Sequence, residues 1–362
     1  MSKEGAGVQR TYITPRGILR GVAARAGLAH GQAWPMPGSA PGGQAFTAAI
    51  VSRRAGAVVS QSLITRIEYD AGKPDPDIDR ELLGIGAPRG PFAGHSLSRP
   101  LIMGVLNVTP DSFSDGGKFS DLGAAVTHGR AMAAAGATLV DVGGESTRPG
   151  AAPVDAGEEV MRTAGVVKAL TSDGVAISID TRHASVMSAG VSAGARVIND
   201  ITALADPLAL EVAAKSGVDV ILMHMQGEPR TMQDDPVYAW APGDVHDFLR
   251  ARVDACRAAG IPLSRIAIDI GLGFGKTAAH NAELLDHLGM FHSLGCPLVV
   301  GASRKSFIGR LSAGEGSHDR LPGSLASALV AVAQGAQILR VHDVAETRQA
   351  LALQAAAYTP GA

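Results

Sequence analysis

The chain has 362 residues, of which 46% are hydrophobic, and a formal net charge of −2. This length allows one α/β barrel of about 250 residues together with a further segment of roughly a hundred. A charge so close to neutral provides no broad basic surface, so we expect no nucleic-acid partner. No apolar run reaches the ~18 to 20 residues of a membrane span, and the N-terminus lacks a signal pattern. We therefore expect no membrane association and a cytoplasmic protein.

The chain contains two cysteines, Cys256 and Cys296. They lie far apart and lack the spacing of metal ligands, which excludes a thiolate zinc site and a disulfide framework. We expect both to be buried free thiols in a reducing compartment.

Residues 1–98 differ in composition from the rest of the chain and are expected to form an N-terminal extension or small accessory subdomain of unknown role. Residues 31–43 are rich in Pro, Gly and Ser, and residues 84–98 have the composition of a linker. Phe46–Ser52 and Ala57–Ile67 carry enough β-branched residues to favour a hairpin. The segment has no cluster of reactive side chains, which favours an appendage packed on the main domain over a regulatory or dimer-supporting role.

From residue 99 to residue 357, short runs of Val, Ile and Leu alternate with Ala-rich amphipathic stretches, as in repeated βα units. Eight such units over about 260 residues predict an α/β fold, a (β/α)8 TIM barrel, rather than an open sheet. Residues 358–362 are expected to be a C-terminal tail. The expected strands are Leu101–Val108, Thr138–Val142, Ala176–Ile179, Arg196–Ile198, Asp219–His224, Ile266–Ile270, Pro297–Ala302 and Gln337–Val341. The expected helices are Leu122–Ala135, Glu158–Leu170, His183–Ala193, Pro207–Lys215, Val245–Ala259, Ala279–Phe291, Ser324–Gln334 and Val344–Ala356.

Long polar loops follow the first two expected strands. Asn107 ends the first strand, where it is either a turn former or a ligand for a hard metal ion or phosphate. Residues 111–117 are too polar and too numerous for a minimal turn, which favours a loop that closes over a ligand. Thr147 and Arg148 lie in the second loop, where a hydroxyl beside a guanidinium forms either a phosphate-binding site or a surface turn.

Asp180, Asn199 and Asp269 end three further strands, all within apolar runs. An unpaired carboxylate is costly in such surroundings, so we expect a ligand to pair with these groups. Carboxylate acceptors with an amide that both donates and accepts suit the amino-pyrimidinone edge of a fused heterocycle. The alternative for any one of them is a helix N-cap.

The run Gly271–Thr277 is rich in glycine but does not have the spacing of a nucleotide-binding loop, because Ile270 stands where a Walker sequence requires Gly. We expect a turn whose backbone approaches a ligand, with Phe274 and Lys276 at its walls. Ser303–Ser306 places two cations and two hydroxyls at the seventh strand end, where they form an anion or carbonyl site or a solvated cluster.

Arg340 and His342 lie two residues apart on the last expected strand and therefore project to the same face. In a barrel that face is the interior or the mouth, where we expect the pair to require an anion. The loops after the seventh and eighth strands are the usual phosphate site of this fold.

Taken together and in chain order, these segments resemble the motifs of the dihydropteroate synthase family over about residues 99–357. The matching segments are residues 107–117, 143–150, 178–181, 198–200, 223–229, 273–276, 303–306 and 340–343. The resemblance implies a cytoplasmic, usually dimeric barrel enzyme of folate synthesis. Such an enzyme joins 6-hydroxymethyl-7,8-dihydropterin pyrophosphate to p-aminobenzoate, and sulfonamides imitate the second substrate.

The resemblance also implies roles for individual residues. Asn107 would contact Mg²⁺ and the pyrophosphate, and the catalytic groups would be Asp180, Arg148, Arg340 and His342. The phosphates or their surroundings would be held by Thr147, Arg148, Arg340 and His342. The pterin edge would be bound by Asp180, Asn199, Asp269 and Lys305. Phe274 and Ser306 would belong to the p-aminobenzoate pocket, capped by the loops that hold Phe113, Asp115 and Arg148. One departure is Ile270, since the family commonly has Pro there.

Two other functions are compatible with a pterin-binding barrel. A methyltetrahydrofolate, corrinoid-linked enzyme would share the pterin-binding Asp and Asn groups but would not need residues 146–150 or 303–306. A non-catalytic paralogue would bind pterin as a structural or regulatory partner, and the presence of every expected ligand type disfavours it.

Overall fold

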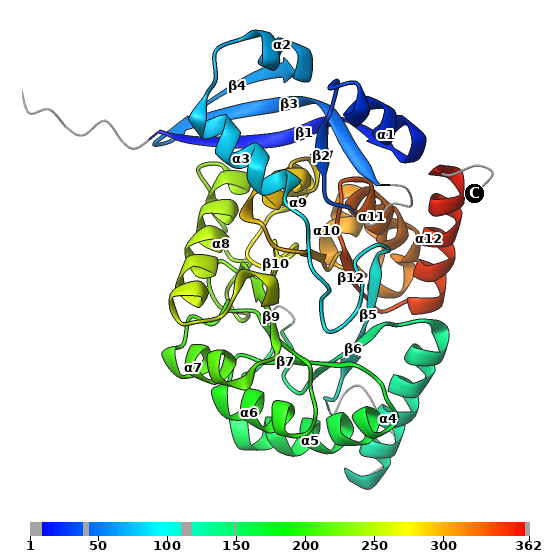
Figure 1. Cartoon of the computed structure of the whole chain (residues 1–362). Coiled ribbons are helices and arrows are strands. Elements are labelled where there is room, and N and C mark those ends of the chain that lie inside the picture. Colours follow the sequence, from blue (N-terminus) through cyan, green and yellow to red (C-terminus); the bar gives the residue numbers. More distant parts are fainter. Residues whose placement is uncertain (1–8, 39–42, 110–117, 148–149, 359–362) are drawn as a thin grey trace, which may run out of the picture.

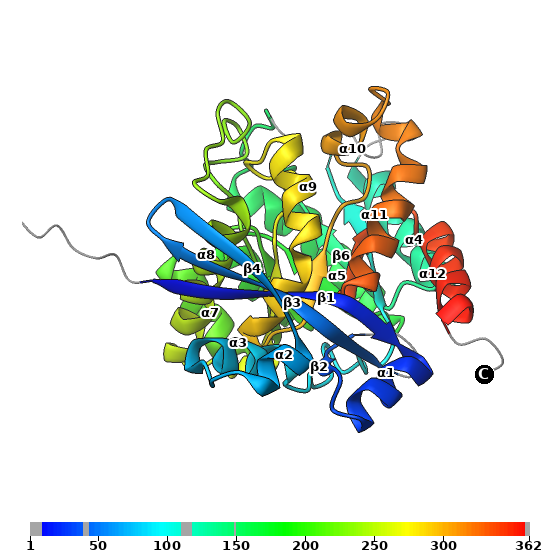
Figure 2. The same cartoon turned by 90° about the horizontal axis from the view of Figure 1, so that it is seen from above.

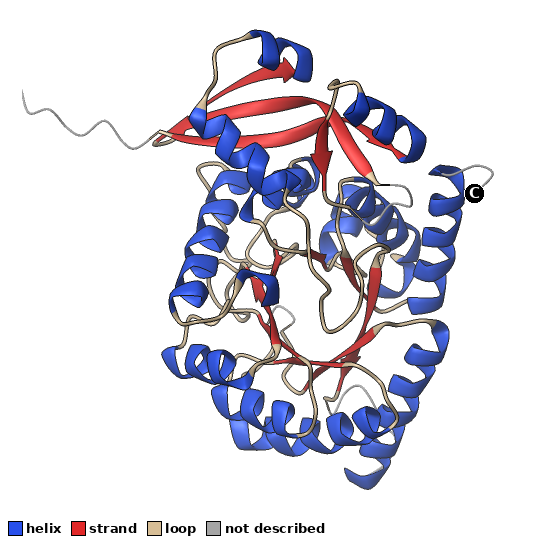
Figure 3. Cartoon of the chain, in the orientation of Figure 1, coloured by secondary structure: helices blue, strands red, loops and turns tan. Residues whose placement is uncertain are grey.

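A computed structural model describes residues 9–38, 43–109, 118–147 and 150–358. Its main body is a closed barrel of eight parallel strands, so the predicted (β/α)8 fold is confirmed. Figure 3 shows the ring of strands enclosed by helices. The barrel strands are β5 (Leu101–Asn107), β6 (Leu139–Gly143), β7 (Ile177–Asp180), β8 (Val197–Asp200), β9 (Asp219–Met223), β10 (Ile266–Asp269), β11 (Leu298–Val300) and β12 (Ile338–Val341).

The outer helices alternate with the strands as expected, except that β11 is followed by two helices, of which the first, α10, was not predicted. They are α4 (Lys118–Ala135), α5 (Ala156–Ser172), α6 (Ala184–Ser192), α7 (Pro207–Ser216), α8 (Ala241–Ala258), α9 (Ala278–Asp286), α10 (Ser306–Leu311), α11 (Leu321–Ala333) and α12 (Val344–Tyr358). The expected helix Ala279–Phe291 is wrong at its end. The α-helix stops at Asp286, and Leu288–Leu294 form a fully buried 3-10 helix, η3. Packing explains the change, because the backbone of Ser293 lies directly against Gly84.

The N-terminal residues form a separate antiparallel sheet with flanking helices (Figures 1 and 2). Its strands are β1 (Arg10–Arg20), β2 (Trp34–Met36), β3 (Gln44–Ala55) and β4 (Val58–Thr65), and its helices are α1 (Gly21–Ala29), α2 (Arg66–Ala71) and α3 (Pro76–Gly86). The expected hairpin is confirmed as β3 and β4, joined at Gly56, whose φ of 62° suits glycine.

The segment expected to be a linker does more than connect. Its first residues complete α3, and Phe92 is fully buried in a cluster with Leu101, Met103 and Leu139 at the amino-terminal end of the barrel. The backbone N–H of Ala93 donates to the carboxylate of Asp219, 2.5 Å away. This segment therefore closes the end of the barrel opposite to the strand-end residues.

The N-terminal unit packs against the barrel through specific polar contacts. The Tyr12 hydroxyl donates to Asp247 at 2.9 Å, and its ring packs edge-on against Trp240 and His246, each at 5.3 Å between ring centroids. Arg250 pairs with Glu81, whose side chain is 2% exposed. The unit thus covers α8 and η3, in agreement with the expectation of an appendage packed on the barrel.

Replacing Tyr12 with Phe tests whether the two parts unfold as one. Loss of a hydrogen bond to a charged acceptor should lower the free energy of unfolding by about 1.5 to 3 kcal/mol. We expect a single transition in chemical denaturation followed by Trp fluorescence and by circular dichroism. Two transitions, with only the first shifted by Tyr12→Phe, would show that the N-terminal unit unfolds independently.

Two observations complete the fold. Cys256 and Cys296 are buried and free, as expected. No helix in the described part of the chain is long and apolar enough to cross a membrane.

Candidate active site

Three predicted site residues meet at the carboxyl ends of the barrel strands. Asp180 ends β7 and pairs in register with Asn199 on β8, and Asp269 ends β10. All three residues are at most 9% exposed. Since the carboxyl ends of parallel strands converge at one mouth, these groups line a common site.

Arg340 joins two buried carboxylates from neighbouring parts of the mouth. Its Nε donates to Asp141 and its Nη2 donates to Asp180, both at 2.6 Å. Asn199 donates to the same Asp141 oxygen at 3.1 Å. The Arg340–His342 pair was expected to require an anion, and for Arg340 the carboxylates of Asp141 and Asp180 provide that negative charge.

Asp141 is a site residue that the sequence analysis missed. It lies inside β6 rather than at its end, is fully buried, and its Oδ1 has no hydrogen-bond partner among the described residues. The sequence does carry a signal for this residue, because a carboxylate within the apolar run Leu139–Val142 is costly unless it is paired. It indicates that Asp141 needs a cationic partner, which Arg340 provides.

The local electrostatics follow from burial and from these pairs. Burial and the nearby Asp141 raise the pKa of Asp180 to about 7, although Arg340 opposes the shift. For Arg340, burial lowers the pKa, but the attraction of Asp141 and Asp180 outweighs burial and raises it. Near neutral pH the site therefore holds a permanent cation beside a carboxyl group that can exchange a proton.

Asp180→Asn should change how stability depends on pH. Because the folded pKa of Asp180 is about 7 and its ordinary value is 3.8, the folded protein retains a proton that the unfolded chain has lost. This group therefore makes the free energy of unfolding fall as pH rises from about 4 to about 7. Denaturant unfolding across this range should show a shallower fall for the variant than for the parent chain. Parallel curves would contradict the assignment.

A second charged pair lies across the mouth. Burial raises the pKa of Asp269, while Lys305 and the N–H of Gly271 oppose the shift. Burial lowers the pKa of Lys305 to about 8, and Asp269 counteracts part of that effect. A Cβ added at Gly301 would lie 3.7 Å from both Asp269 Oδ2 and Lys305 Nζ, so the absence of a side chain there leaves space between the two groups.

Apolar side chains form one wall of this space. Phe274 packs with Ile201, Met223 and Met232 in a buried cluster. The Lys305 ammonium lies 4.6 Å from the centre of the Phe274 ring. A flat heterocycle can contact such a wall while its polar edge meets the strand-end groups.

The glycine-rich run is held in a tight turn beside the mouth. A Cβ on Gly271 would lie 1.9 Å from the carbonyl oxygen of His224, so only glycine fits. Lys276 was expected at the wall of the ligand site, and this is wrong. Its buried ammonium donates to His224 Nδ1 at 2.9 Å and to the carbonyls of Gly271 and Phe274. Ile270 is fully buried, and the turn forms without the Pro that the family commonly has.

The cations of Ser303–Ser306 point to different partners. Arg304 pairs with Asp343, whereas Lys305 faces Asp269. The hydroxyl of Ser303 lies 3.1 Å from His342 Nδ1 and accepts from the His342 backbone N–H at 3.2 Å. Ser306 is exposed at the first residue of α10. Only Lys305 of this segment therefore reaches the charged centre.

The first two loops are described in part. Asn107 is half-buried at the end of β5, in register with Gly143 of β6, and Thr147 is half-buried after β6. Arg148, Phe113 and Asp115 lie outside the described residues.

A further polar cluster next to the mouth was missed. Glu145 accepts from Arg182 at 3.0 and 3.1 Å and from the backbone N–H of Val154. Fully buried Glu159 lies 2.7 Å from His183 Nδ1. Ligand atoms of Glu145, Glu159 and His183 lie within 4.8 Å of one another, a spacing that a metal ion can bridge. Because Glu145 pairs with Arg182 and also accepts from the Val154 N–H, it links the start of the loop after β6 to its end.

Comparisons with known proteins agree with this geometry. The model of the pterin binding enzyme family matches residues 103–342. The dihydropteroate synthase of Escherichia coli K12 is 50% identical over 256 residues, which cover 70% of this chain and 90% of that protein. The Haemophilus influenzae enzyme is 47% identical, with 70% and 93% covered.

Solved structures give the same result. Yersinia pestis dihydropteroate synthase, in complex with a sulfonamide drug, is 50% identical with a TM-score of 0.69, covering 72% of this chain and 95% of that chain. The Xanthomonas albilineans enzyme in complex with 7,8-dihydropteroate is 44% identical with a TM-score of 0.67, covering 73% and 96%. The same enzyme with 4-aminobenzoic acid is 47% identical with a TM-score of 0.70, covering 74% and 97%.

A closed parallel barrel whose strand ends combine buried carboxylates, an amide and a lysine defines a pterin-binding barrel enzyme. Within that class, the chain belongs to the dihydropteroate synthase family.

Proposed function

We infer that this chain is a transferase that condenses 6-hydroxymethyl-7,8-dihydropterin pyrophosphate with p-aminobenzoate, giving 7,8-dihydropteroate and pyrophosphate in folate biosynthesis. The observation that carries this function is the single mouth shared by Asp180, Asn199, Asp269 and Lys305, with Arg340 beside it. The relatives support it, because their structures include complexes with 7,8-dihydropteroate, 4-aminobenzoic acid and a sulfonamide drug. Their names also argue against the corrinoid-linked alternative.

The pterin edge is bound by the strand-end groups. The carboxylates of Asp180 and Asp269 accept from pterin N–H groups, and Asn199 both donates and accepts. Lys305 donates to a pterin oxygen or ring nitrogen. Gly301 leaves the space between Asp269 and Lys305 in which the edge lies.

Catalysis rests on stabilising charge as pyrophosphate leaves. Arg340, His342, Thr147 and Arg148 surround the phosphates and stabilise the negative charge that develops when the C–O bond breaks. Asp180, beside the pterin, stabilises the positive charge on the methylene group. The neutral arylamine is already a nucleophile, so no strong base or covalent enzyme intermediate is required. Phe274 and Ser306 form the amine pocket.

We also propose that the enzyme uses Mg²⁺ held by Asn107 together with the pyrophosphate. The donors fit, because Mg²⁺ prefers hard oxygen ligands, few of them from protein, with substrate phosphates completing the set. Asn107 ends β5 in register with Gly143, and Asp141, whose Oδ1 has no partner among the residues that the structure describes, lies two residues before Gly143 on β6. When bound, the ion supplies charge neutralisation for the leaving group.

We propose a homodimer whose interface includes the outer groove between α9, α10 and α11. Leu285, Phe307 and Ile308 line this groove, and Leu311 and Val330 are 55% and 45% exposed. Apolar residues exposed on the same patch of two copies can be buried together across a two-fold axis. Sedimentation equilibrium tests the dimer, and Val330→Glu should shift it toward monomer. We also place the enzyme in the cytoplasm, where its two free thiols remain reduced.

The activity is tested with the purified full chain, 6-hydroxymethyl-7,8-dihydropterin pyrophosphate, p-aminobenzoate and Mg²⁺, with chromatographic detection of 7,8-dihydropteroate. Product should form with Mg²⁺ and should be lost when a chelator removes it. Tight binding of both substrates without product would identify a non-catalytic pterin-binding paralogue.

A further inference from the structure

The loop after β9, residues 224–240, packs directly against the glycine-rich run that follows β10. A Cβ added to Gly271 would lie 1.9 Å from the carbonyl oxygen of His224. A Cβ added to Gly275 would lie 2.3 Å from the carbonyl oxygen of Gln226. The backbone of the loop therefore touches the backbone of the run at two points, where a side chain would not fit.

Two side chains of this loop hold the backbone on either side of Phe274. Gln233 Nε2 donates to the carbonyl of Gly273 at 2.6 Å. The Tyr238 hydroxyl donates to the carbonyl of Gly275 at 2.7 Å. Gly273 and Gly275 have φ angles of 81° and 59°, and glycine backbone would otherwise have wide conformational freedom. The two hydrogen bonds restrict that freedom at the residues that flank Phe274.

The carbonyl group between these two is held by Lys276, which is 2% exposed. Its ammonium donates to the carbonyl of Phe274 at 3.0 Å and to that of Gly271 at 2.9 Å. The carbonyl groups of residues 273, 274 and 275 are thus each bonded to a different side chain. A peptide group in this stretch cannot rotate without breaking one of these hydrogen bonds.

The position of the Phe274 ring follows from this backbone and from its neighbours. The ring packs with Met223 and Met232, and the Lys305 ammonium lies 4.6 Å from its centre. Met232 directly precedes Gln233, so the loop that supplies the hydrogen bond also supplies part of the wall. Because a Phe side chain has few rotatable bonds, fixing its backbone leaves few positions for the ring.

We propose that Gln233, Tyr238 and Lys276 are positioning residues that hold Phe274 in place for p-aminobenzoate. This inference rests on the proposed function, in which Phe274 forms part of the amine pocket. When one of the hydrogen bonds is lost, the backbone at Phe274 samples other conformations, and only the molecules with the ring in place bind the amine. The apparent affinity for p-aminobenzoate falls in proportion to that fraction. At saturating amine the rate is retained, because the bound substrate selects the molecules with the ring in place.

Steady-state kinetics of Tyr238→Phe and Gln233→Met on the full chain tests the proposal. Each replacement removes one donor and nearly keeps the size of the side chain. With the pterin pyrophosphate saturating, KM for p-aminobenzoate should rise about threefold to tenfold in each variant and further in the double variant. The value of kcat should change by less than about twofold. Calorimetric affinity for the pterin pyrophosphate should also stay within about twofold, because the strand-end groups that bind the pterin edge are unchanged.

Hydrogen exchange followed by mass spectrometry gives a readout that needs no turnover. The peptide that contains Gly271–Thr277 should exchange faster in both variants than in the parent chain, because its backbone opens more often. If the parent chain formed no dihydropteroate, the proposed function would fail. If the parent chain were active and exchange in this peptide were unchanged in the variants, this inference alone would fail.

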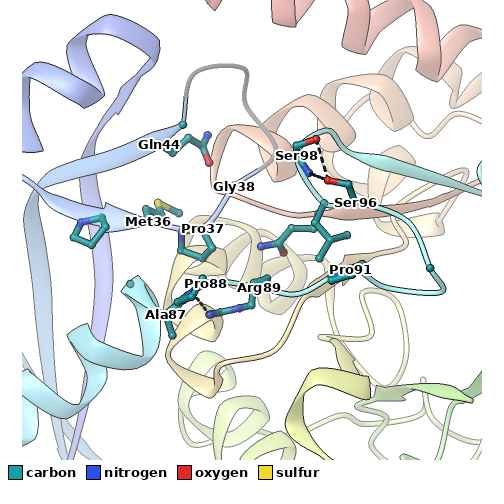
Figure 4. A pocket seen from close by; sticks show the side chains of 16 residues that line it. Met36, Pro37, Gly38, Gln44, Ala87, Pro88, Arg89, Pro91, Ser96 and Ser98 are labelled. Atoms are coloured by element: carbon teal, nitrogen blue, oxygen red, sulfur yellow. Dashed lines mark hydrogen bonds between the residues drawn. The ribbon is translucent and has the colours of Figure 1, made fainter. Parts of the chain in front are cut away.

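Two control variants remove comparable hydrogen bonds elsewhere. Tyr69→Phe removes a hydroxyl that donates to Asp79 at 2.6 Å within the N-terminal unit. Gln44→Met removes an amide that donates to the carbonyls of Val332 and Ala333. Gln44 borders a cavity of about 690 Å³ between the N-terminal unit and the barrel (Figure 4). Both controls should leave KM for p-aminobenzoate unchanged, whatever their effect on the melting temperature.

Three results overturn the proposal. The first is an unchanged KM for p-aminobenzoate in both Tyr238→Phe and Gln233→Met. The second is an equal loss of affinity for the pterin pyrophosphate, which would mean that the whole mouth is disturbed. The third is the same rise in KM in the control variants, which would mean that a general loss of stability raises KM.

Discussion

Replacing Arg340 with Met should lower the free energy of unfolding by about 3 to 5 kcal/mol at pH 8, because it leaves Asp141 and Asp180 buried without their cation. Both carboxylates lie 2.6 Å from Arg340 in the parent chain. The loss should become smaller as pH falls from 8 toward 7, and it should change little below pH 7, where Asp180 is protonated in both proteins. Asp180 has a pKa of about 7 even with Arg340 in place, and without that attraction it accepts a proton at a higher pH still. Urea unfolding of both proteins between pH 5 and pH 8 measures the difference.

The matched control is Arg304→Met on the neighbouring segment. Arg304 also pairs with one carboxylate, Asp343, but its side chain is 35% exposed. Exposed ion pairs contribute about 0 to 1 kcal/mol, so this variant should change stability little and with no comparable pH dependence. Equal losses of unfolding free energy for Arg304→Met and Arg340→Met would contradict the prediction, because they would mean that the burial of Asp141 and Asp180 does not add to the cost of removing their cation.

The strand ends were predictable because their signal is local. A short run of Val, Ile and Leu marks a buried strand, and the expected strands begin and end within two residues of the observed ones. In a parallel barrel, this alone brings Asp180, Asn199 and Asp269 to one mouth.

The partners of these groups were harder to predict because pairing depends on distant residues. Asp141 and Arg340 are 199 positions apart, and no local pattern joins them. Lys276 shows the same limit, because a lysine in a glycine-rich run suggests a ligand contact. Its actual partner, His224, lies 52 positions away. Which cation faces a ligand and which supports a loop is decided by three-dimensional packing.

The sequence of the N-terminal unit contains helix-capping motifs from which α2 and α3 could have been predicted. Thr65 and Glu68 form a capping box at the start of α2, and Asp75 caps α3 directly before Pro76. Its attachment to the barrel had no such signal, since Tyr12 and Asp247 are 235 positions apart. The short 3-10 helix Leu288–Leu294 likewise depends on this attachment.

Asp269→Asn should reduce affinity for 6-hydroxymethyl-7,8-dihydropterin pyrophosphate by about tenfold to more than a hundredfold while the fold is kept. An Asn oxygen can still accept from the Gly271 N–H, now bonded to Asp269 Oδ1 at 2.8 Å. The other atom becomes a donor, so a pterin N–H loses its acceptor. Asp269 also supports the charge of Lys305, whose pKa of about 8 should fall further without it. Loss of a charged hydrogen bond costs about 1.5 to 3 kcal/mol, and partial neutralisation of Lys305 adds to it.

Calorimetric titration of the pterin pyrophosphate measures this loss, with Asp219→Asn as the matched control. Asp219 begins the adjacent strand β9 at the opposite end of the barrel, where it accepts from the Ala93 N–H. Replacing Asp219 should leave pterin affinity unchanged. For Asp269→Asn, the difference in pterin affinity from the parent chain should become smaller above pH 8, because Lys305 is then increasingly neutral in the parent chain as well. Unchanged affinity in Asp269→Asn, with denaturation showing a folded protein, would remove Asp269 from the pterin site. The strand-end assignment would then rest on Asp180 and Asn199 alone.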